Sequence, residues 1–166
     1  MVLALASCLR EEDFPDIPVI QYEGFQKIYN PELELYDRGV ISISYKDGNG
    51  DIGLAPGDTF PPFDPDSKYY HNLLIDYYEF QNGTLKKVPI VVYNSQTQEF
   101  DTLSLSARVP MLTPAGNNKA ISGEIRDTIF IYNFSSPFDT IRFDVTLVDR
   151  SLNESNTIST PLIIRD

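Results

Sequence analysis

The chain has few of the residues that build disulfides, metal centres and catalytic triads. Its 166 residues contain one cysteine, one histidine and no tryptophan. A single cysteine excludes an intrachain disulfide, so the core has to hold without one. A single histidine excludes a zinc site made of several histidines, and a Ser-His-Asp triad would have to use His71. We interpret His71 as structural and expect no enzymatic activity.

Positive charge is also scarce. The sequence has 13 lysines and arginines against 24 aspartates and glutamates, which gives a formal net charge of −11. Nucleic acids and anionic lipid headgroups are bound by clustered lysine and arginine, so we expect no nucleic-acid partner. An acidic surface attracts cations instead. No apolar run approaches the roughly 20 residues of a membrane-spanning helix.

The chain is rich in strand-forming and turn-forming residues. Ten tyrosines, ten phenylalanines and 12 prolines accompany short stretches in which apolar and polar residues alternate. Such alternation predicts half-buried strands, and Asn82-Gly83 predicts a tight hairpin turn. About eight strands are expected, at residues 17–25, 39–46, 69–81, 85–93, 100–109, 123–134, 140–149 and 157–164.

This count of strands, without a long helical pattern, predicts an all-β fold. We expect an antiparallel two-sheet sandwich of the immunoglobulin or fibronectin type. An eight-stranded barrel is the alternative. Residues 16–166 are enough for one core, so we expect a single β-sandwich domain there.

Cys8 ends the stretch Leu5-Ala6-Ser7-Cys8, in which small residues lead to a thiol. The stretch resembles a bacterial lipobox, which implies cleavage before Cys8, a diacylglycerol on its sulfur and an acylated (palmitate-type) amine. Residues 1–7 would then be a residual signal peptide. They are shorter than a secretory signal and carry no positive charge, so we expect an upstream start codon or a truncated signal. The alternative is a buried thiol in a short N-terminal strand.

Residues 8–15 are expected to form an acidic tether. Leu9-Arg10-Glu11-Glu12-Asp13 places charge directly after the proposed anchor, and charge does not enter a bilayer. The segment resembles the acidic export signal of Bacteroidetes lipoproteins, which implies a lipid-anchored protein on the outer membrane, exposed at the cell surface. The periplasmic face is the alternative, and a merely solvated tether would have a similar composition.

The motif Asp47-Gly48-Asn49-Gly50-Asp51-Ile52-Gly53 is a candidate calcium site. Alternating oxygen-bearing side chains suit a hard cation such as Ca²⁺, and the glycines allow the loop to fold around it. Its candidate ligands are Asp47, Asn49, Asp51 and Asp58. The motif is not an EF-hand, because Ile52 stands where that loop has glycine and Asp58 where it has glutamate. The alternative is a glycine turn whose acids are neutralised by Arg150.

The same motif, followed late in the chain by Val148-Asp149-Arg150 and Ser155-Asn156, resembles outer-membrane or surface lipoproteins of the Bacteroidetes with an immunoglobulin-like domain. The resemblance carries no activity with it. We therefore expect a non-catalytic, lipid-anchored interaction or structural module with an envelope protein or a glycan as partner. The alternative is a carbohydrate-binding accessory lipoprotein of a glycan-uptake system, with Tyr70 and Tyr78 as stacking residues.

Overall fold

The computed structural model describes residues 14–113 and 119–165, and these form an all-β fold. One short 3₁₀ helix, η1 (Lys68–Tyr70), is the only helix among them, and no helix there is long and apolar enough to cross a bilayer. The strands are β1 (Val19–Asn30), β2 (Leu35–Asp47), β3 (Leu73–Gln81), β4 (Thr84–Lys87), β5 (Ile90–Asn94), β6 (Glu99–Leu103), β7 (Ile121–Phe130), β8 (Thr140–Leu147), β9 (Ile158–Ser159) and β10 (Ile163–Ile164).

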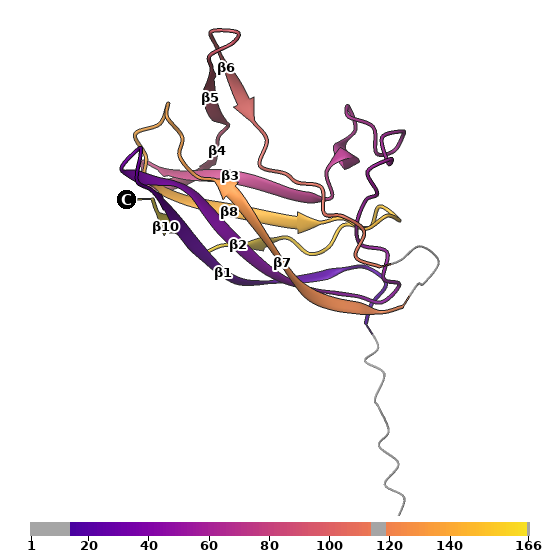
Figure 1. Cartoon of the computed structure of the whole chain (residues 1–166). Helices are drawn as coiled ribbons and strands as arrows, with labels where there is room; N and C mark the ends of the chain where they lie inside the picture. Colours follow the sequence, from indigo (N-terminus) through magenta and orange to yellow (C-terminus); the bar gives the residue numbers. More distant parts are fainter. Residues whose placement is uncertain (1–13, 114–118, 166) are drawn as a thin grey trace, which may run out of the picture.

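The strands form two larger sheets and a hairpin, all antiparallel. One sheet has the order β1-β2-β7, and the other has the order β10-β8-β3-β4 with β9 also paired to β8. Figure 1 shows the two sheets as stacked layers, with the β5-β6 hairpin rising away from them. Neither sheet closes on itself within the described residues, so the antiparallel two-sheet prediction is confirmed at this level and the barrel is not found.

The core lies between the two sheets. The inward face of β8 presents Ile141, Phe143, Val145 and Leu147, all fully buried, as its alternation predicts. Phe25 of β1 stacks on Phe143 with ring centroids 5.8 Å apart and so joins the layers. The packing that fixes the sheets relative to one another is therefore centred on Phe143.

Two predicted strands are interrupted at prolines. The segment 85–93 divides near Pro89: β4 ends at Lys87, and β5 begins at Ile90 in a separate two-stranded sheet. The segment 157–164 divides around Pro161, which separates β9 from β10. Proline has no backbone N–H to donate to a neighbouring strand, so pairing ends there. The first strand is longer than expected and continues to Asn30.

The β3-β4 hairpin confirms the predicted turn. Asn82 and Gly83 have φ values of 52° and 83°, the left-handed pair that a two-residue hairpin needs. Gly83→Ala should lower the free energy of unfolding by about 1 kcal/mol, because an alanine is strained in this region. Urea denaturation measures the loss. Gly57→Ala is the matched control, because Gly57 has ordinary φ and open space around it; equal losses in both variants would contradict the turn geometry.

Candidate metal site

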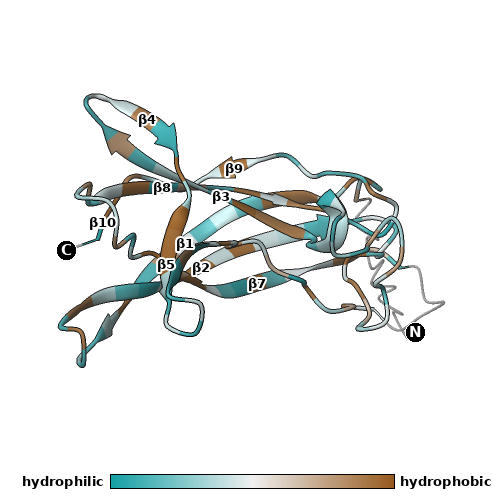
Figure 2. Ribbon diagram, turned by 90° about the horizontal axis from the view of Figure 1, so that it is seen from above, coloured by the Kyte–Doolittle hydropathy of each residue, from teal (hydrophilic) through white to brown (hydrophobic). Residues whose placement is uncertain are grey.

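Two loops distant in the sequence meet at one end of the sheets. Ile52, in the loop that follows β2, forms a β-bridge with Asp149, in the loop that follows β8. The backbone N–H of Arg150 donates to the carbonyl of Asp51 at 3.2 Å. Figure 2 shows the loops of this end on the right, opposite the β3-β4 hairpin and the C-terminus. The loop after β2 and the loop after β8 therefore lie at the same end of the fold.

Three carboxylates gather where the loops meet. One oxygen from each of Asp47, Asp51 and Asp149 lies within 4.8 Å of the others, a spacing that could hold a metal ion. Asp47 is 0% exposed and Asp149 is 1% exposed. We call these residues the carboxylate triad. It joins the last residue of β2, the glycine turn and the loop after β8.

Two oxygens of the triad are buried without a hydrogen bond. Asp47 Oδ2 accepts from the N–H of Asp51 at 3.0 Å, and Asp51 Oδ2 accepts from the Ser151 hydroxyl at 2.7 Å. The Oδ1 atoms of Asp47 and Asp51 have no partner among the described residues. Both oxygens of Asp149 accept from Asn153, each at 2.8 Å. Unpaired buried carboxylate oxygens are costly, and a bound cation removes that cost.

The described part of the chain gives the triad no ion pair with a lysine or arginine. Burial, and then the charges of Asp51 and Asp149, raise the pKa of Asp47 to about 6, against smaller lowering effects of backbone hydrogen bonds. Burial likewise raises the pKa of Asp149. The site therefore disfavours three negative charges unless a cation is present.

Glycines allow the turn to be enclosed. Gly48 donates its N–H to the carbonyl of Pro15 at 2.8 Å, and a Cβ on Gly48 would lie 2.3 Å from the carbonyl oxygen of Phe14. Gly50 has a φ of +66°, and a Cβ there would lie 2.0 Å from the carbonyl oxygen of Lys119. The beginning of the described chain and the segment before β7 thus cover the turn. Larger residues would push this cover away.

The structure brings together only part of the predicted ligand set. Asp47 and Asp51 belong to the triad, whereas Asn49 stays in the turn, with its Oδ1 3.4 Å from the N–H of Asp51. Asp58 lies outside the triad: it pairs with Arg150 and accepts from the N–H of Ala55 at 2.7 Å. Asp149 takes the third position. It stands in the Val148-Asp149-Arg150 motif, but only the pairing of the two loops shows that its side chain points to Asp47.

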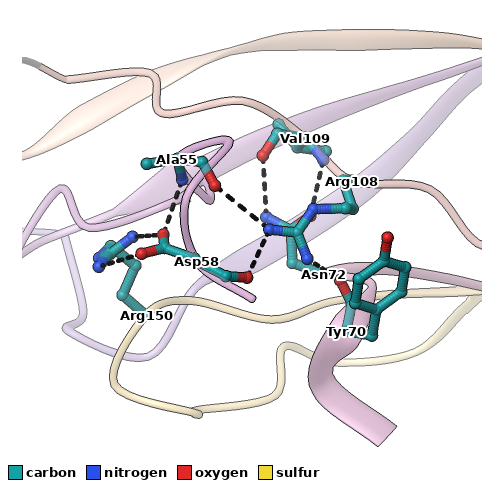
Figure 3. Close-up of polar contacts among 7 residues, drawn as sticks. All are labelled: Ala55, Asp58, Tyr70, Asn72, Arg108, Val109 and Arg150. Carbon is teal, nitrogen blue, oxygen red and sulfur yellow. Dashed lines mark hydrogen bonds and ion pairs between the residues drawn. The ribbon is translucent and has the colours of Figure 1, made fainter. Parts of the chain in front are cut away.

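Arg150 does not neutralise Asp47 or Asp51, so that expectation is wrong. Its guanidinium pairs with Asp58 and lies over the ring of Phe63. The hydrogen bond from Arg150 is the main reason why the pKa of Asp58 is lowered. Figure 3 shows the pair beside Arg108, which donates to the carbonyls of Tyr70, Ala55 and Asp58. These contacts hold the long loop between β2 and β3. Among residues 14–113 and 119–165, no lysine or arginine forms an ion pair with the triad.

Tyr70 and Tyr78, the predicted stacking residues, are not brought together. Tyr70 is the last residue of η1, and the guanidinium carbon of Arg108 lies 4.7 Å from the centroid of its ring. Tyr78 lies on β3, and the guanidinium carbon of Arg142 lies 5.0 Å from the centroid of its ring. The first belongs to η1 and the second to β3, and each contacts a different arginine. Each ring already stacks on an arginine, so the pair forms no common platform for a sugar.

Two further predictions concern His71 and Cys8. His71 packs edge-on against Tyr70, and burial followed by the charge of Arg108 lowers its pKa. This setting agrees with a structural histidine. The predicted lipidation site Cys8 and most of the acidic tether lie outside the described residues.

Comparisons with known proteins add no relative. No family model matches the chain, and neither the curated proteins nor the solved structures gave a match to it. The functional argument therefore depends on the geometry of the carboxylate triad and on the sequence.

Proposed function

We propose that the protein is a calcium-binding module of the cell envelope, non-catalytic and held to the outer membrane through a lipid on Cys8. The observation that carries the calcium assignment is the pair of buried Oδ1 atoms of Asp47 and Asp51 without hydrogen bonds. Ligands that are all oxygen select hard cations. Ca²⁺ accepts irregular carboxylate sets at about 2.3 to 2.6 Å, whereas Mg²⁺ needs a near-octahedral shell and keeps several waters.

The position of the triad supports a structural role for the ion. Asp47 and Asp149 are almost completely buried, so an ion between them would lie beneath the surface. It would join the end of β2 to the loop after β8, which belong to different sheets. A cation placed there holds the two layers together at this end and offers a substrate little access. This supports an interaction or structural module over an enzyme.

Calcium should stabilise the protein, and Asp51→Asn should abolish the effect. Binding only to the folded state adds about 2.7 kcal/mol at 100 times the Kd, or roughly 5–10 °C in the melting temperature of a domain of this size. Calorimetric titration with Ca²⁺ and melting curves in Ca²⁺, Mg²⁺ and chelator measure both quantities. In Asp51→Asn the unpaired Oδ1 no longer shares a negative charge, so heat of binding and stabilisation should both be lost.

Asp76→Asn is the matched control. Asp76 lies on β3, its side chain is 47% exposed, and it pairs with Lys87 of β4. Its replacement changes the net charge by the same amount. This variant should keep the full calcium effect. Equal melting temperatures of the wild-type protein in calcium and in chelator, with no heat of binding, would refute the calcium proposal.

The envelope assignment is supported by sequence and architecture together. The lipobox-like Leu5-Ala6-Ser7-Cys8 and the acidic residues after it resemble Bacteroidetes lipoproteins. Two stacked antiparallel sheets are compatible with an immunoglobulin-like domain, the fold of that family. The glycan-uptake alternative stays a prediction, and the separation of Tyr70 from Tyr78 gives it no support.

A further inference from the structure

One long edge of β7 pairs with no other strand of the described chain. β7 stands at the end of the sheet order β1-β2-β7, and among residues 14–113 and 119–165 only β2 pairs with it. Its ten residues contain no proline and no lysine, and its register with β2 runs without a bulge. Figure 1 shows β7, in orange, in front of β2 and β1. A regular edge strand of this length offers its backbone N–H and C=O groups to a further strand.

The opposite edge of the same sheet, β1, is less suited to strand addition. Its register with β2 shifts between Tyr22 and Gly24 and again between Ile28 and Tyr29. The side chain of Asn156 donates to the carbonyl of Ile20 and accepts from its N–H, both at 2.9 Å. Bulges and covering groups are the usual protections of an edge strand. A further strand is therefore expected at β7.

Self-complementary charge points to a second copy of this chain as the added strand. In an antiparallel pair of β7 strands with a two-fold axis at Ile125, Glu124 of each copy faces Arg126 of the other. These side chains are 51% and 62% exposed, and within one chain they lie 3.7 Å apart. The pair of strands thus gathers two acids and two bases with no net charge. This neutrality favours association, because each chain carries a net charge of −11.

The neighbouring registers are less favourable. An axis at Glu124 places this glutamate opposite its own copy, and an axis at Arg126 does the same for the arginine. Like charges directly opposite one another destabilise a pair of strands. With the axis at Ile125, Asp127, the third charged residue of β7, faces Gly123, which has no side chain. The charges of the strand therefore select one register.

An apolar groove beside the end of β7 fits the same register. It has a volume of about 410 Å³ and is lined by Arg38, Leu103–Leu105 and Thr128–Phe130. With the axis at Ile125, Ile121 of the second copy lies opposite Ile129, beside this groove. An isoleucine in that place removes apolar surface of the groove from water, which favours association.

We propose that the protein forms a two-fold dimer in which β7 pairs antiparallel with β7 of a second copy. The three-stranded sheets of the two copies then join into one continuous sheet. The pairing uses residues 121–129 of each copy. It uses no residue of the carboxylate triad and does not depend on the proposed function.

Reversing one charge of the Glu124–Arg126 pair should separate the dimer. Analytical ultracentrifugation of the full-length chain with Cys8→Ser measures the association without a disulfide or a lipid. Glu124→Arg and Arg126→Glu each turn two opposite-charge pairs into two like-charge pairs, so the dissociation constant should rise about tenfold or more. Lys86→Glu is the matched control. Lys86 is an exposed residue of β4 in the other sheet, and its replacement changes the net charge as Arg126→Glu does; this variant should dimerise like the parent.

Exchanging the two charges tests the register itself. The double variant Glu124→Arg/Arg126→Glu should dimerise like the parent, because opposite charges face each other again. An equimolar mixture of the two single variants should form mixed dimers for the same reason. A parent protein that stays monomeric at its highest soluble concentration overturns the proposal. A dimer that both single variants leave intact also overturns it, as does a double variant that stays monomeric although its circular dichroism equals that of the parent.

Discussion

Asp47→Asn is expected to stabilise the protein in chelator and to destabilise it, relative to the wild type, in calcium. The pKa of Asp47 is about 6 in the folded protein, against 3.8 as its ordinary value. Ionisation of Asp47 therefore destabilises the folded protein. The protein has its full stability below about pH 4, loses it progressively as the pH rises to about 6, and at pH 7 carries the whole cost of the buried charge. Removing that charge should raise the free energy of unfolding of the metal-free protein by up to about 3 kcal/mol at pH 7.

Calcium should reverse the order of the two proteins. The cation favours the ionised triad, so the wild type gains stability with calcium and Asp47→Asn gains little. Urea denaturation at pH 7 in calcium and in chelator measures the reversal, with Asp76→Asn as the control that should follow the wild type in both. In chelator, lowering the pH from 7 to 5 should stabilise the wild type and leave Asp47→Asn unaffected. A variant less stable than the wild type under every condition would indicate a structural hydrogen-bonding role for Asp47 instead.

Glu79 is the second residue whose replacement should have a large effect. It is 0% exposed on the inward face of β3, and four side chains donate to its carboxylate. Tyr77 and Asn133 donate to Oε1 at 3.0 and 2.9 Å, and Gln81 and Ser136 donate to Oε2 at 2.8 and 2.6 Å. The network joins β3 to the segment between β7 and β8. Both oxygens of Glu79 thus have hydrogen-bond donors, unlike Oδ1 of Asp47 and Oδ1 of Asp51.

Glu79→Gln should lower the free energy of unfolding by about 3 kcal/mol, because hydrogen bonds to a charged acceptor are lost and an amide donor then faces other donors. Burial raises the pKa of Glu79, but the four side-chain hydrogen bonds outweigh it, and the pKa is lowered overall. Its stabilising contribution is thus present above the ordinary pKa of 4.5 and is lost as the pH falls below it.

Urea denaturation at pH 7 and at pH 3 tests this contribution. The difference between the wild type and Glu79→Gln should be large at pH 7 and should shrink at pH 3. Glu124→Gln, at an exposed glutamate of β7, is the control and should change stability by less than about 0.5 kcal/mol. A small effect of Glu79→Gln at pH 7 would mean that the network does not stabilise the fold.

Most of the local structure can be predicted from the sequence, whereas less of the tertiary arrangement can. Alternation predicts β8 and its inward residues, and Asn82-Gly83 predicts its hairpin, because both depend on neighbours in the chain. The turns of the chain at Pro89 and Pro161 are harder to predict, since a proline within an apolar run also occurs at the edge of a continuous strand. Glu79 follows Ile75 and Tyr77 on the inward face of β3, so its burial was readable from the same alternation.

The candidate site, too, is predicted only in part from the sequence. The spacing of Asp47 and Asp51 predicts two of the three carboxylates, because both lie in one glycine-rich turn. Asp149 joins them only through the pairing of Ile52 with Asp149 between loops that are far apart in sequence. Asp58 lies close to the turn in sequence, but in the folded structure its side chain pairs with Arg150 and is not part of the triad. Charge pairing of this kind is set by the folded structure.

A crystal structure of the protein grown in calcium tests the central proposal most directly. We predict an anomalous difference peak at the triad, with an ion about 2.3 to 2.6 Å from Asp47 Oδ1, Asp51 Oδ1 and a carboxylate oxygen of Asp149. No ion at saturating calcium, with Asp47 Oδ1 protonated and donating to a carboxylate of Asp51 or Asp149, would contradict it.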